Sequence, residues 1–412
     1  LVARELTPSV TAGIVKENIA GIITETGGTT SHSAILARAL EIPAVLSVEG
    51  VASSLKNGDT VVVDGSEGAV IVNPDDNTVA EYSKKRDAFL AERKELENYR
   101  GRETKSASGE VYELFCNIGK PEDAVKAVDA DGEGVGLFRT EFLFMDRTSI
   151  PTEDEQFEAY KKAALILKGK SLIIRTLDIG GDKDIPYLGL EKEENPFMGF
   201  RAIRYCLKNR ELFKSQIKAI LRASAFGDIK IMFPLITTMD ELREGKKLVT
   251  ECKADLRNMG INFNENIQVG VMVETASAAV IADMLAKEAD FFSIGTNDLT
   301  GYTMACDRGN NDVSYLYSPL QPSVLRMIKR TIECGVQNGI SVGMCGEAAA
   351  NKLMIPLLIS FGLTEFSVSA PSVLNVRKII STWTKEEADK VTAKVLEMST
   401  QQEIVEYLKS VV

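Results

Sequence analysis

The chain has little of what marks secreted, membrane-spanning or nucleic-acid-binding proteins. No apolar run approaches the length of a membrane span. The six cysteines are scattered and form no C-x-x-C pair, which indicates reduced thiols in a cytoplasmic protein. Basic residues are too few for non-specific nucleic-acid binding, because 48 Lys and Arg against 59 Asp and Glu leave a net charge of −11.

The length and composition predict a folded protein with more than one domain. The 412 residues leave room for one large domain and a small one. Hydrophobic residues make up 44% of the chain, which is enough for a sizeable core, and the charged fraction of 26% is ordinary.

Histidine is the scarcest chemical group, since His32 is the only one in the chain. It lies in Gly27–Arg38 (GGTTSHSAILAR), where two glycines and four hydroxyl residues precede a run of good helix formers that Pro43 ends. We therefore expect His32 at a helix N-terminus, where free N–H groups favour an anion and a neutral, nucleophilic imidazole. Taken alone, a lone histidine is more often structural.

The residues around His32 favour a chemical role. The segment Gly27–Val45 (GGTTSHSAILARALEIPAV) resembles the phosphohistidine signature of the phosphoenolpyruvate-utilising enzymes, which include Enzyme I of the sugar phosphotransferase system, pyruvate phosphate dikinase and phosphoenolpyruvate synthase. In that family the matching histidine carries a phosphoryl group. One departure is Thr29, where Enzyme I often has arginine.

The first part of the chain is expected to be a small α/β domain over residues 1–78. Short apolar runs near Leu1 and at Gly21–Thr24 indicate buried strands, and Val61–Gly65 with Ala69–Val72 indicates a β-hairpin. The resemblance implies a phosphohistidine swivelling domain that lacks its earlier strands and its helical docking subdomain, so we expect an N-terminally truncated chain. Residues 79–105 are expected to form a charged linker helix, with a coiled coil as the less favoured alternative.

Residues 106–412 are expected to fold as a TIM (β/α)8 barrel. Eight strand-like runs alternate with amphipathic, helix-length segments, and a doubly wound open sheet is the alternative. The expected strands are Tyr112–Asn117, Gly134–Arg139, Leu172–Leu177, Ile229–Phe233, Gln268–Val273, Phe291–Ile294, Ser341–Met344 and Phe366–Val368. The clearest expected helices are Thr152–Leu167, Met239–Leu256, Ala276–Lys287 and Gln321–Asn338.

Polar residues follow these strands at the end where a barrel places its chemistry. Glu274 and Asp298 follow neighbouring strands, and Mg²⁺ is usually held by one or two carboxylates together with substrate oxygens. Either acid alone could equally be a helix cap or a buried ion pair. Arginine forks suit phosphate and carboxylate oxygens, and the candidates are Arg139, Arg175, Arg201 and Arg308.

Cys345 lies in Gly343–Glu347 (GMCGE), at the end of an expected strand. A cysteine is most often a small buried hydrophobic residue. At a glycine-flanked strand end on the active rim, an acid–base role is also plausible.

The resemblance extends into the expected barrel and covers nearly the whole chain. The segments more similar to Enzyme I than to its relatives are Gly134–Thr152, Ile174–Asp184, Glu193–Arg204, Asp290–Asn310 and Gly343–Glu347. The resemblance implies phosphoenolpyruvate binding by Arg139, Arg175, Arg201, Asn297 and Arg308. It also implies Mg²⁺ on Glu274 and Asp298, proton donation to the enolate by Cys345 and phosphoryl acceptance by His32. Onward transfer to a histidine phosphocarrier protein and a homodimer through the barrel are further implications. Ala276 and Gly301 depart from the family pattern, where proline and glutamine are common.

Two other functions remain open at this point. The chain could be a fragment of pyruvate phosphate dikinase or phosphoenolpyruvate synthase, although it has no glycine loop of a nucleotide-binding kind. It could also be a non-catalytic module that senses phosphoenolpyruvate, for which the loss of one essential group would be the sign. Against this, the essential groups are all present: His32, Glu274, Asp298 and Cys345.

Overall fold

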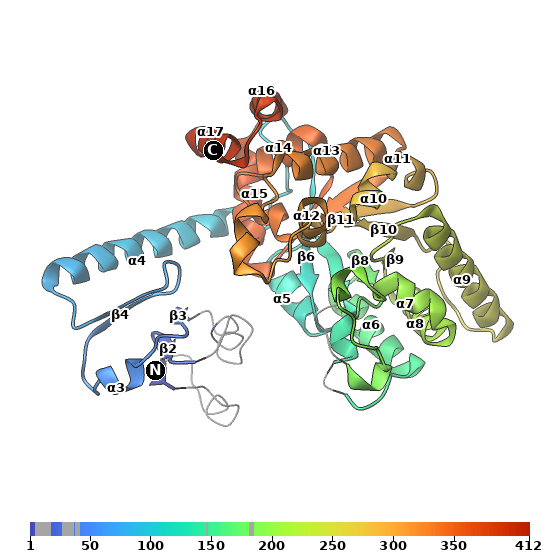
Figure 1. The fold of residues 1–412 in the computed structure, drawn as a ribbon, viewed down its shortest axis with the longest axis horizontal. Coiled ribbons are helices and arrows are strands. Elements are labelled where there is room, and N and C mark those ends of the chain that lie inside the picture. Colours follow the sequence, from blue (N-terminus) through green and yellow to red (C-terminus); the bar gives the residue numbers. More distant parts are fainter. Residues whose placement is uncertain (5–17, 27–36, 38–41, 146, 181–184) are drawn as a thin grey trace. The chain divides into compact units, whose positions relative to one another are not determined.

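The structure is a computed structural model that describes residues 1–4, 18–26, 37, 42–145, 147–180 and 185–412 (Figure 1). His32 and most of the helix expected after it lie outside the described residues. The chain forms two compact units, Leu1–Glu95 and Leu96–Val412. None of the helices in the described ranges is both long and apolar enough to cross a membrane.

The first unit contains two small sheets. Strands β1 (Val2–Ala3), β2 (Ile22–Thr24) and β3 (Ala44–Val45) form a parallel sheet, in which Ile22 is fully buried. Strands β4 (Val61–Asp64) and β5 (Ala69–Val72) form the expected antiparallel hairpin. The sequence analysis did not anticipate β3, because its two residues are too short to show a period.

A long helix, α4 (Asp76–Leu96), follows the hairpin of the first unit, after the short helix α3 (Val51–Ser54). None of its residues is buried, and Phe89 is 56% exposed. A helix without a buried face is therefore present in this region, but it ends at Leu96 and does not extend to residue 105 as expected. A 3₁₀ turn, η2 (Glu97–Tyr99), comes directly after it.

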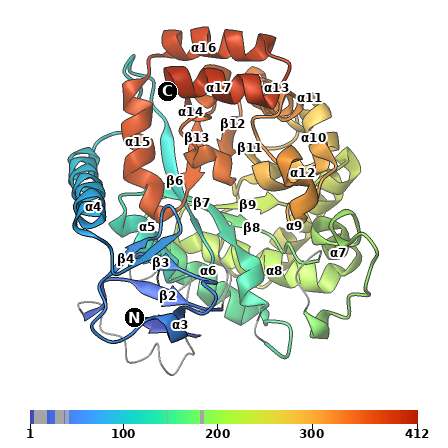
Figure 2. The same ribbon diagram turned by 60° about the vertical axis from the view of Figure 1, so that its left-hand side comes forward.

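The second unit is built on a closed eight-stranded barrel, which confirms the expected fold (Figures 1 and 2). All neighbouring strands are parallel, and β9 pairs with β10 to close the ring. The strands are β6 (Glu113–Ile118), β7 (Gly134–Arg139), β8 (Leu172–Arg175), β9 (Ile229–Phe233), β10 (Val269–Val273), β11 (Phe291–Ile294), β12 (Ser341–Met344) and β13 (Glu365–Val368). Each matches an expected strand to within two residues at either end.

Helices surround this barrel, as Figure 2 shows. Thr152 and Thr238 begin α6 and α9 with capping boxes, in which a threonine and a glutamate satisfy each other's backbone N–H groups. The helices are α5 (Asp123–Asp129), α6 (Glu153–Leu167), α7 (Ala202–Lys208), α8 (Arg210–Ala223), α9 (Met239–Asn258), α10 (Ala276–Val280), α11 (Ala282–Leu285), α12 (Thr296–Met304), α13 (Pro322–Gln337), α14 (Ile355–Phe361), α15 (Val373–Thr382), α16 (Lys385–Glu397) and α17 (Gln401–Val411).

The single helix expected over Ala276–Lys287 is instead two short helices, α10 and α11, that meet at Ile281. The backbone carbonyl of Val280 accepts hydrogen bonds from Arg330 Nε at 3.0 Å and Nη2 at 2.7 Å. This carbonyl, at the end of α10, is therefore bound by a side chain of α13 and not by an N–H of a continued helix.

The inside of the barrel is apolar through its middle. One side chain from each of five consecutive strands, β7 to β11, and the residue directly after β12 pack into a buried cluster: Leu137, Ile173, Met232, Met272, Phe291 and Cys345. A much larger buried cluster lies between the strands and the surrounding helices. The barrel is therefore a packed core, and any chemistry must lie at its ends.

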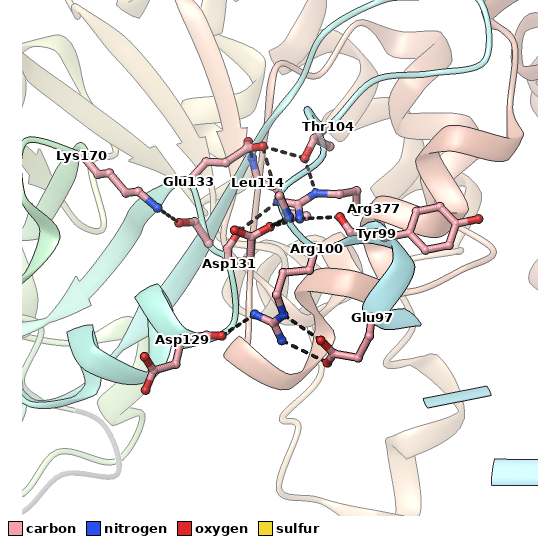
Figure 3. A network of polar contacts seen from close by, with 12 residues as sticks. Glu97, Tyr99, Arg100, Thr104, Leu114, Asp129, Asp131, Glu133, Lys170 and Arg377 are labelled. Carbon is pink, nitrogen blue, oxygen red and sulfur yellow. Dashed lines mark hydrogen bonds and ion pairs between the residues drawn. The ribbon is translucent and has the colours of Figure 1, made fainter. Parts of the chain in front are cut away.

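Arg377 of α15 contacts both the segment that precedes β6, at Tyr99 and Thr104, and the loop between α5 and β7 (Figure 3). It is only 2% exposed, and it pairs with Asp131 and, at 3.5 Å, with Glu133. Its Nε donates to Thr104 Oγ1 at 2.9 Å, and its Nη1 donates to the carbonyl of Tyr99 at 3.1 Å. A buried guanidinium is tolerated here because its donors are matched by acceptors.

Candidate active site

The carboxyl ends of the parallel strands meet at one rim, and they deliver most of the candidate residues. Arg139 and Arg175 end β7 and β8, where they are partners in register. Glu274 directly follows β10, and Cys345 directly follows β12. Asn297 and Asp298 lie in the first turn of α12, just after β11, and complete this group.

Arg175 is buried in the rim, with 7% of its surface exposed. Two acids hold its guanidinium, since Glu141 Oε1 lies 2.8 Å from Nη2 and Asp178 Oδ2 lies 2.9 Å from Nη1. Nε has no hydrogen-bond partner in the described part of the chain. Burial lowers the pKa of Arg175, but the charges of Asp178 and Glu141 raise it by more, so the side chain stays protonated.

Arg201 is 5% exposed and reaches the same rim from a loop rather than from a strand. Its Nη2 lies 2.7 Å from Asp178 Oδ1 and 3.4 Å from Asp298 Oδ2. Nη1 donates to the hydroxyl of Tyr302 at 3.3 Å, and the guanidinium lies 5.8 Å from the ring centroid of Phe197. The pKa of Arg201 is raised, because Asp178 and Asp298 outweigh the lowering effect of burial.

The charges along the rim alternate in sign. The order is Glu141, Arg175, Asp178, Arg201 and Asp298, and each is paired with the next. Such alternation makes buried charge tolerable, because each ion has a partner in a region of low dielectric. It also fixes the directions of the two guanidinium groups.

Glu274 is a carboxylate in an unfavourable place for negative charge. It is 2% exposed, and its Oε1 accepts a hydrogen bond from the backbone N–H of Leu235 at 2.7 Å. Burial raises the pKa of Glu274 to about 8, with further contributions from Asp298 and Asp178, while Arg175 and Arg201 lower it. The surroundings of Glu274 therefore disfavour its negative charge, and a bound cation would offset this cost.

The described residues contain no group of three or more His, Cys, Asp or Glu side chains that could hold a metal ion. Glu274 and Asp298 form a pair of carboxylates, and their mutual repulsion is one reason for the raised pKa of Glu274. Two carboxylates suit Mg²⁺, which usually takes one or two from the protein and completes its shell with waters and substrate oxygens. The donor set therefore fits Mg²⁺.

Cys345 has its side chain inside the barrel, with 5% of its surface exposed. Burial raises the pKa of its thiol to about 11, against the lowering effects of the Ser293 hydroxyl and of Arg175 and Arg139. A thiol with this pKa is protonated at neutral pH, so it can donate a proton but is a poor nucleophile.

The remaining candidate arginines lie at the exposed edge of this group. Arg139 is exposed and makes no hydrogen bond or ion pair with any described residue, but its charge acts on Cys345. Arg308 is exposed and lies 6.0 Å from the ring centroid of Phe197, the ring that also faces Arg201. The backbone carbonyl of Asn297 accepts a hydrogen bond from Tyr317 at 2.9 Å.

The structure thus brings Arg139, Arg175, Arg201, Glu274, Asp298 and Cys345 within electrostatic reach of one another at one rim. The sequence analysis missed Glu141, Asp178, Tyr302 and Phe197. Asp178 and Glu141 lie two or three residues beyond strand ends, and that position was the available signal.

Unusual backbone conformations cluster around these residues. Leu235, which donates to Glu274, has a φ of 56°, and Ala202, which follows Arg201, has a φ of 50°. Gly180 has a φ of 119°, and a Cβ there would lie 3.1 Å from Arg201 Cα, so the position requires glycine. Strained positions of this kind are common at functional sites.

Two family models match the chain. The model described as the PEP-binding domain of PEP-utilising enzymes matches residues 93–384, and the model described as their mobile domain matches residues 1–68.

Curated relatives match almost the whole chain. A phosphoenolpyruvate-protein phosphotransferase from Bacillus subtilis (strain 168) is 51% identical over 409 residues, which cover 99% of this chain and 72% of the relative. A protein of the same name from Staphylococcus carnosus (strain TM300) is 47% identical and covers 99% and 71%.

Among solved structures, a citrate lyase beta subunit from M. tuberculosis, complexed with oxaloacetate and magnesium, is 15% identical. It covers 69% of this chain and 99% of that chain with a TM-score of 0.36, which is too low to support a conclusion.

Proposed function

This chain belongs to the phosphoenolpyruvate-utilising enzymes, and from that premise we propose which of its residues perform the reaction. Its function is phosphoryl transfer from phosphoenolpyruvate in the sugar phosphotransferase system. Relatives of that activity align over 99% of the chain, so a dikinase or synthase fragment and a non-catalytic sensor are both disfavoured.

We assign phosphoenolpyruvate binding to the cationic side of the rim: Arg139, Arg175, Arg201, Asn297 and Arg308. The two buried guanidinium groups are held in place by Asp178, so they need little reorganisation when charge develops on the substrate. Arg139 supplies a cation that is not already committed to an acid of the described chain. Guanidinium groups bind phosphate and carboxylate oxygens through paired hydrogen bonds.

We assign Mg²⁺ binding to Glu274 and Asp298. When bound, the ion would supply positive charge to the phosphate and enolate oxygens of the substrate. Glu274 is held toward the site by the N–H of Leu235, and the positive charge of Arg201 lies beside Asp298.

His32 is the proposed phosphoryl acceptor. Its neutral imidazole attacks the phosphorus, an N–P bond forms, and the bond from phosphorus to the enol oxygen breaks. The arginines stabilise the charge spread over the transferred oxygens in a loose transition state. The departing enolate takes a proton at carbon from the thiol of Cys345 and becomes pyruvate. The raised pKa of Cys345 supports this role, since the donor is protonated before each turnover.

The proposal extends to the organisation of the chain and its partners. Residues 1–78 would be the swivelling phosphohistidine domain, residues 79–105 the linker helix and residues 106–412 the phosphoenolpyruvate-binding barrel. A histidine phosphocarrier protein would take the phosphoryl group from His32, and the barrels would pair as a homodimer. We also propose that the protein acts in the cytoplasm, because the six cysteines of this chain are all free thiols.

One observation carries the assignment: the strand ends and the loops after them bring buried acids, buried guanidinium groups and a protonated thiol to one rim. Arg139→Ala tests it without disturbing the buried network, because Arg139 is exposed and has no ion pair among the described residues. Affinity for phosphoenolpyruvate with Mg²⁺, measured by calorimetry, should fall by about 10- to 100-fold. Arg326→Ala, an exposed arginine on α13, should leave it unchanged. Equal affinities for the two variants would contradict the assignment.

A further inference from the structure

The backbone of Cys345 lies just beyond the ladder that joins its strand to β13. The last register pairs are Gly343 with Glu365 and Met344 with Phe366. On the side of β11, the Cys345 N–H still donates to the carbonyl of Ile294 at 3.2 Å. The β12–β13 ladder ends before this residue, and a side chain holds the Cys345 carbonyl.

That group is the side chain of Asn117, near the end of β6. Its Nδ2 donates to the carbonyl of Cys345 at 3.0 Å and to the carbonyl of Ser367 at 3.2 Å. Asn117 therefore reaches across β13 and joins three strands where the β12–β13 ladder stops. Holding the carbonyl of Cys345 from one side and its N–H from the other fixes the peptide planes on either side of this residue, and with them the position of its Cβ. From that Cβ the thiol donates to the carbonyl of Ile294, with Sγ 3.8 Å from the oxygen.

The orientation of the Asn117 amide is itself fixed. Its Oδ1 accepts a hydrogen bond from the hydroxyl of Ser367 at 2.7 Å, so Nδ2 must point at the two carbonyls. Room for Ser367 comes from Gly136, where the register of β7 shifts. A Cβ at Gly136 would lie 2.6 Å from the Cβ of Ser367, so glycine is required for this close approach.

We propose that Asn117 is a positioning residue that aims the Cys345 thiol at the carbon to be protonated, with its amide oriented by Ser367. The inference rests on the proposed role of Cys345 as the proton donor. Displacement of a donor by about 1 Å can cost about 100-fold in rate. Aspartate cannot replace Asn117, because its carboxylate would face two carbonyl oxygens and has no proton to donate.

The test is a single turnover of the full chain with Mg²⁺ and phosphoenolpyruvate carrying stereospecific isotope labels at C3, run in D₂O. The chirality of the pyruvate methyl group shows from which face the proton arrived. The parent should deliver it to one face. Asn117→Asp should release pyruvate about 100-fold more slowly and with both faces protonated, while its affinity for phosphoenolpyruvate is unchanged.

Three further variants separate the possible results. Ser367→Ala removes a single hydroxyl and should show the same loss of facial selectivity to a smaller extent, which keeps the test available if Asn117→Asp does not fold. Asn258→Asp, an exposed asparagine at the end of α9, is the matched control and should behave as the parent. Cys345→Ala should lose facial selectivity completely.

The outcomes distinguish the inference from its premise. If the parent protonates both faces, or if Cys345→Ala still protonates a single face, the proposed role of Cys345 is wrong, whatever the Asn117 variant shows. If both behave as expected but folded Asn117→Asp and Ser367→Ala retain the rate and the single face of the parent, the positioning role of Asn117 is wrong.

Discussion

The carboxylate of Asp178 lies 2.7 Å from the guanidinium of Arg201, and both side chains are more than nine-tenths buried. The same carboxylate also pairs with Arg175, so a single acid sets the relative positions of the two buried arginines. The anion-binding part of the rim is therefore organised before any substrate arrives, which is the condition for electrostatic stabilisation of a transition state.

Replacing this acid should cost much more than breaking a similar pair at the surface. Asp178→Asn leaves two buried guanidinium groups without their shared charge, and the free energy of unfolding should fall by about 3 kcal/mol in urea denaturation. The control is Asp283→Asn, whose pair with Arg330 has the same 2.7 Å separation but is almost half exposed. It should cost less than about 1 kcal/mol. Equal losses would contradict the organising role of Asp178.

Glu365 predicts a specific dependence of stability on pH. This carboxyl lies inside the barrel, its Oε1 has no hydrogen-bond partner among the described residues, and burial, together with Glu113, raises its pKa to about 8 from an ordinary 4.5. Between these values the folded protein holds a proton that the unfolded protein has released. Stability should therefore fall as the pH rises from about 4.5 to 8 and be independent of this group above that range.

Glu365→Gln removes the titrating group and should reduce that fall, by at most about 1.4 kcal/mol per pH unit. The measurement is denaturant unfolding at several pH values. Glu211→Gln, at an exposed position on α8, should keep the slope of the parent. An unchanged slope in Glu365→Gln would show that Glu365 is ionised in the folded protein at neutral pH.

The Arg377 network predicts a local effect on the segment before the barrel. Arg377→Met removes the donors to Asp131, Thr104 and the carbonyl of Tyr99, so residues 97–104 should become more accessible to proteases. Because the paired acids are about 30% exposed, the loss of unfolding free energy should be near the lower end of the range for a buried pair, about 3 kcal/mol. The control, Arg330→Met, should be cleaved at the same sites and rates as the parent. If Arg377→Met is cleaved faster only outside residues 97–104, the anchoring role is wrong.

The sequence predicted the barrel well because its signals are local. Each strand is a short apolar run such as Leu172–Arg175 or Val269–Val273, and parallel strands necessarily bring the residues after them to one rim. That rule alone placed Arg175, Glu274 and Cys345 together. The helix expected over Thr152–Leu167 likewise matches α6, for which Thr152 is the N-cap.

The parts that sequence could not predict depend on contacts between distant segments. The pairing of Asp178 with Arg201, the contact of Arg330 with the Val280 carbonyl and the reach of Asn117 to Cys345 join residues 23, 50 and 228 positions apart. No periodic pattern in the sequence encodes such contacts. Strand β3 was missed because two residues show no period.

The most direct measurement is phosphoryl labelling of the chain with phosphoenolpyruvate and Mg²⁺, followed by identification of the labelled residue and quantification of pyruvate. The account predicts one pyruvate released for each phosphoryl group bound, with all of the label on His32 and none on a His32→Ala variant. Labelling of His32→Ala to the level of the parent would contradict it.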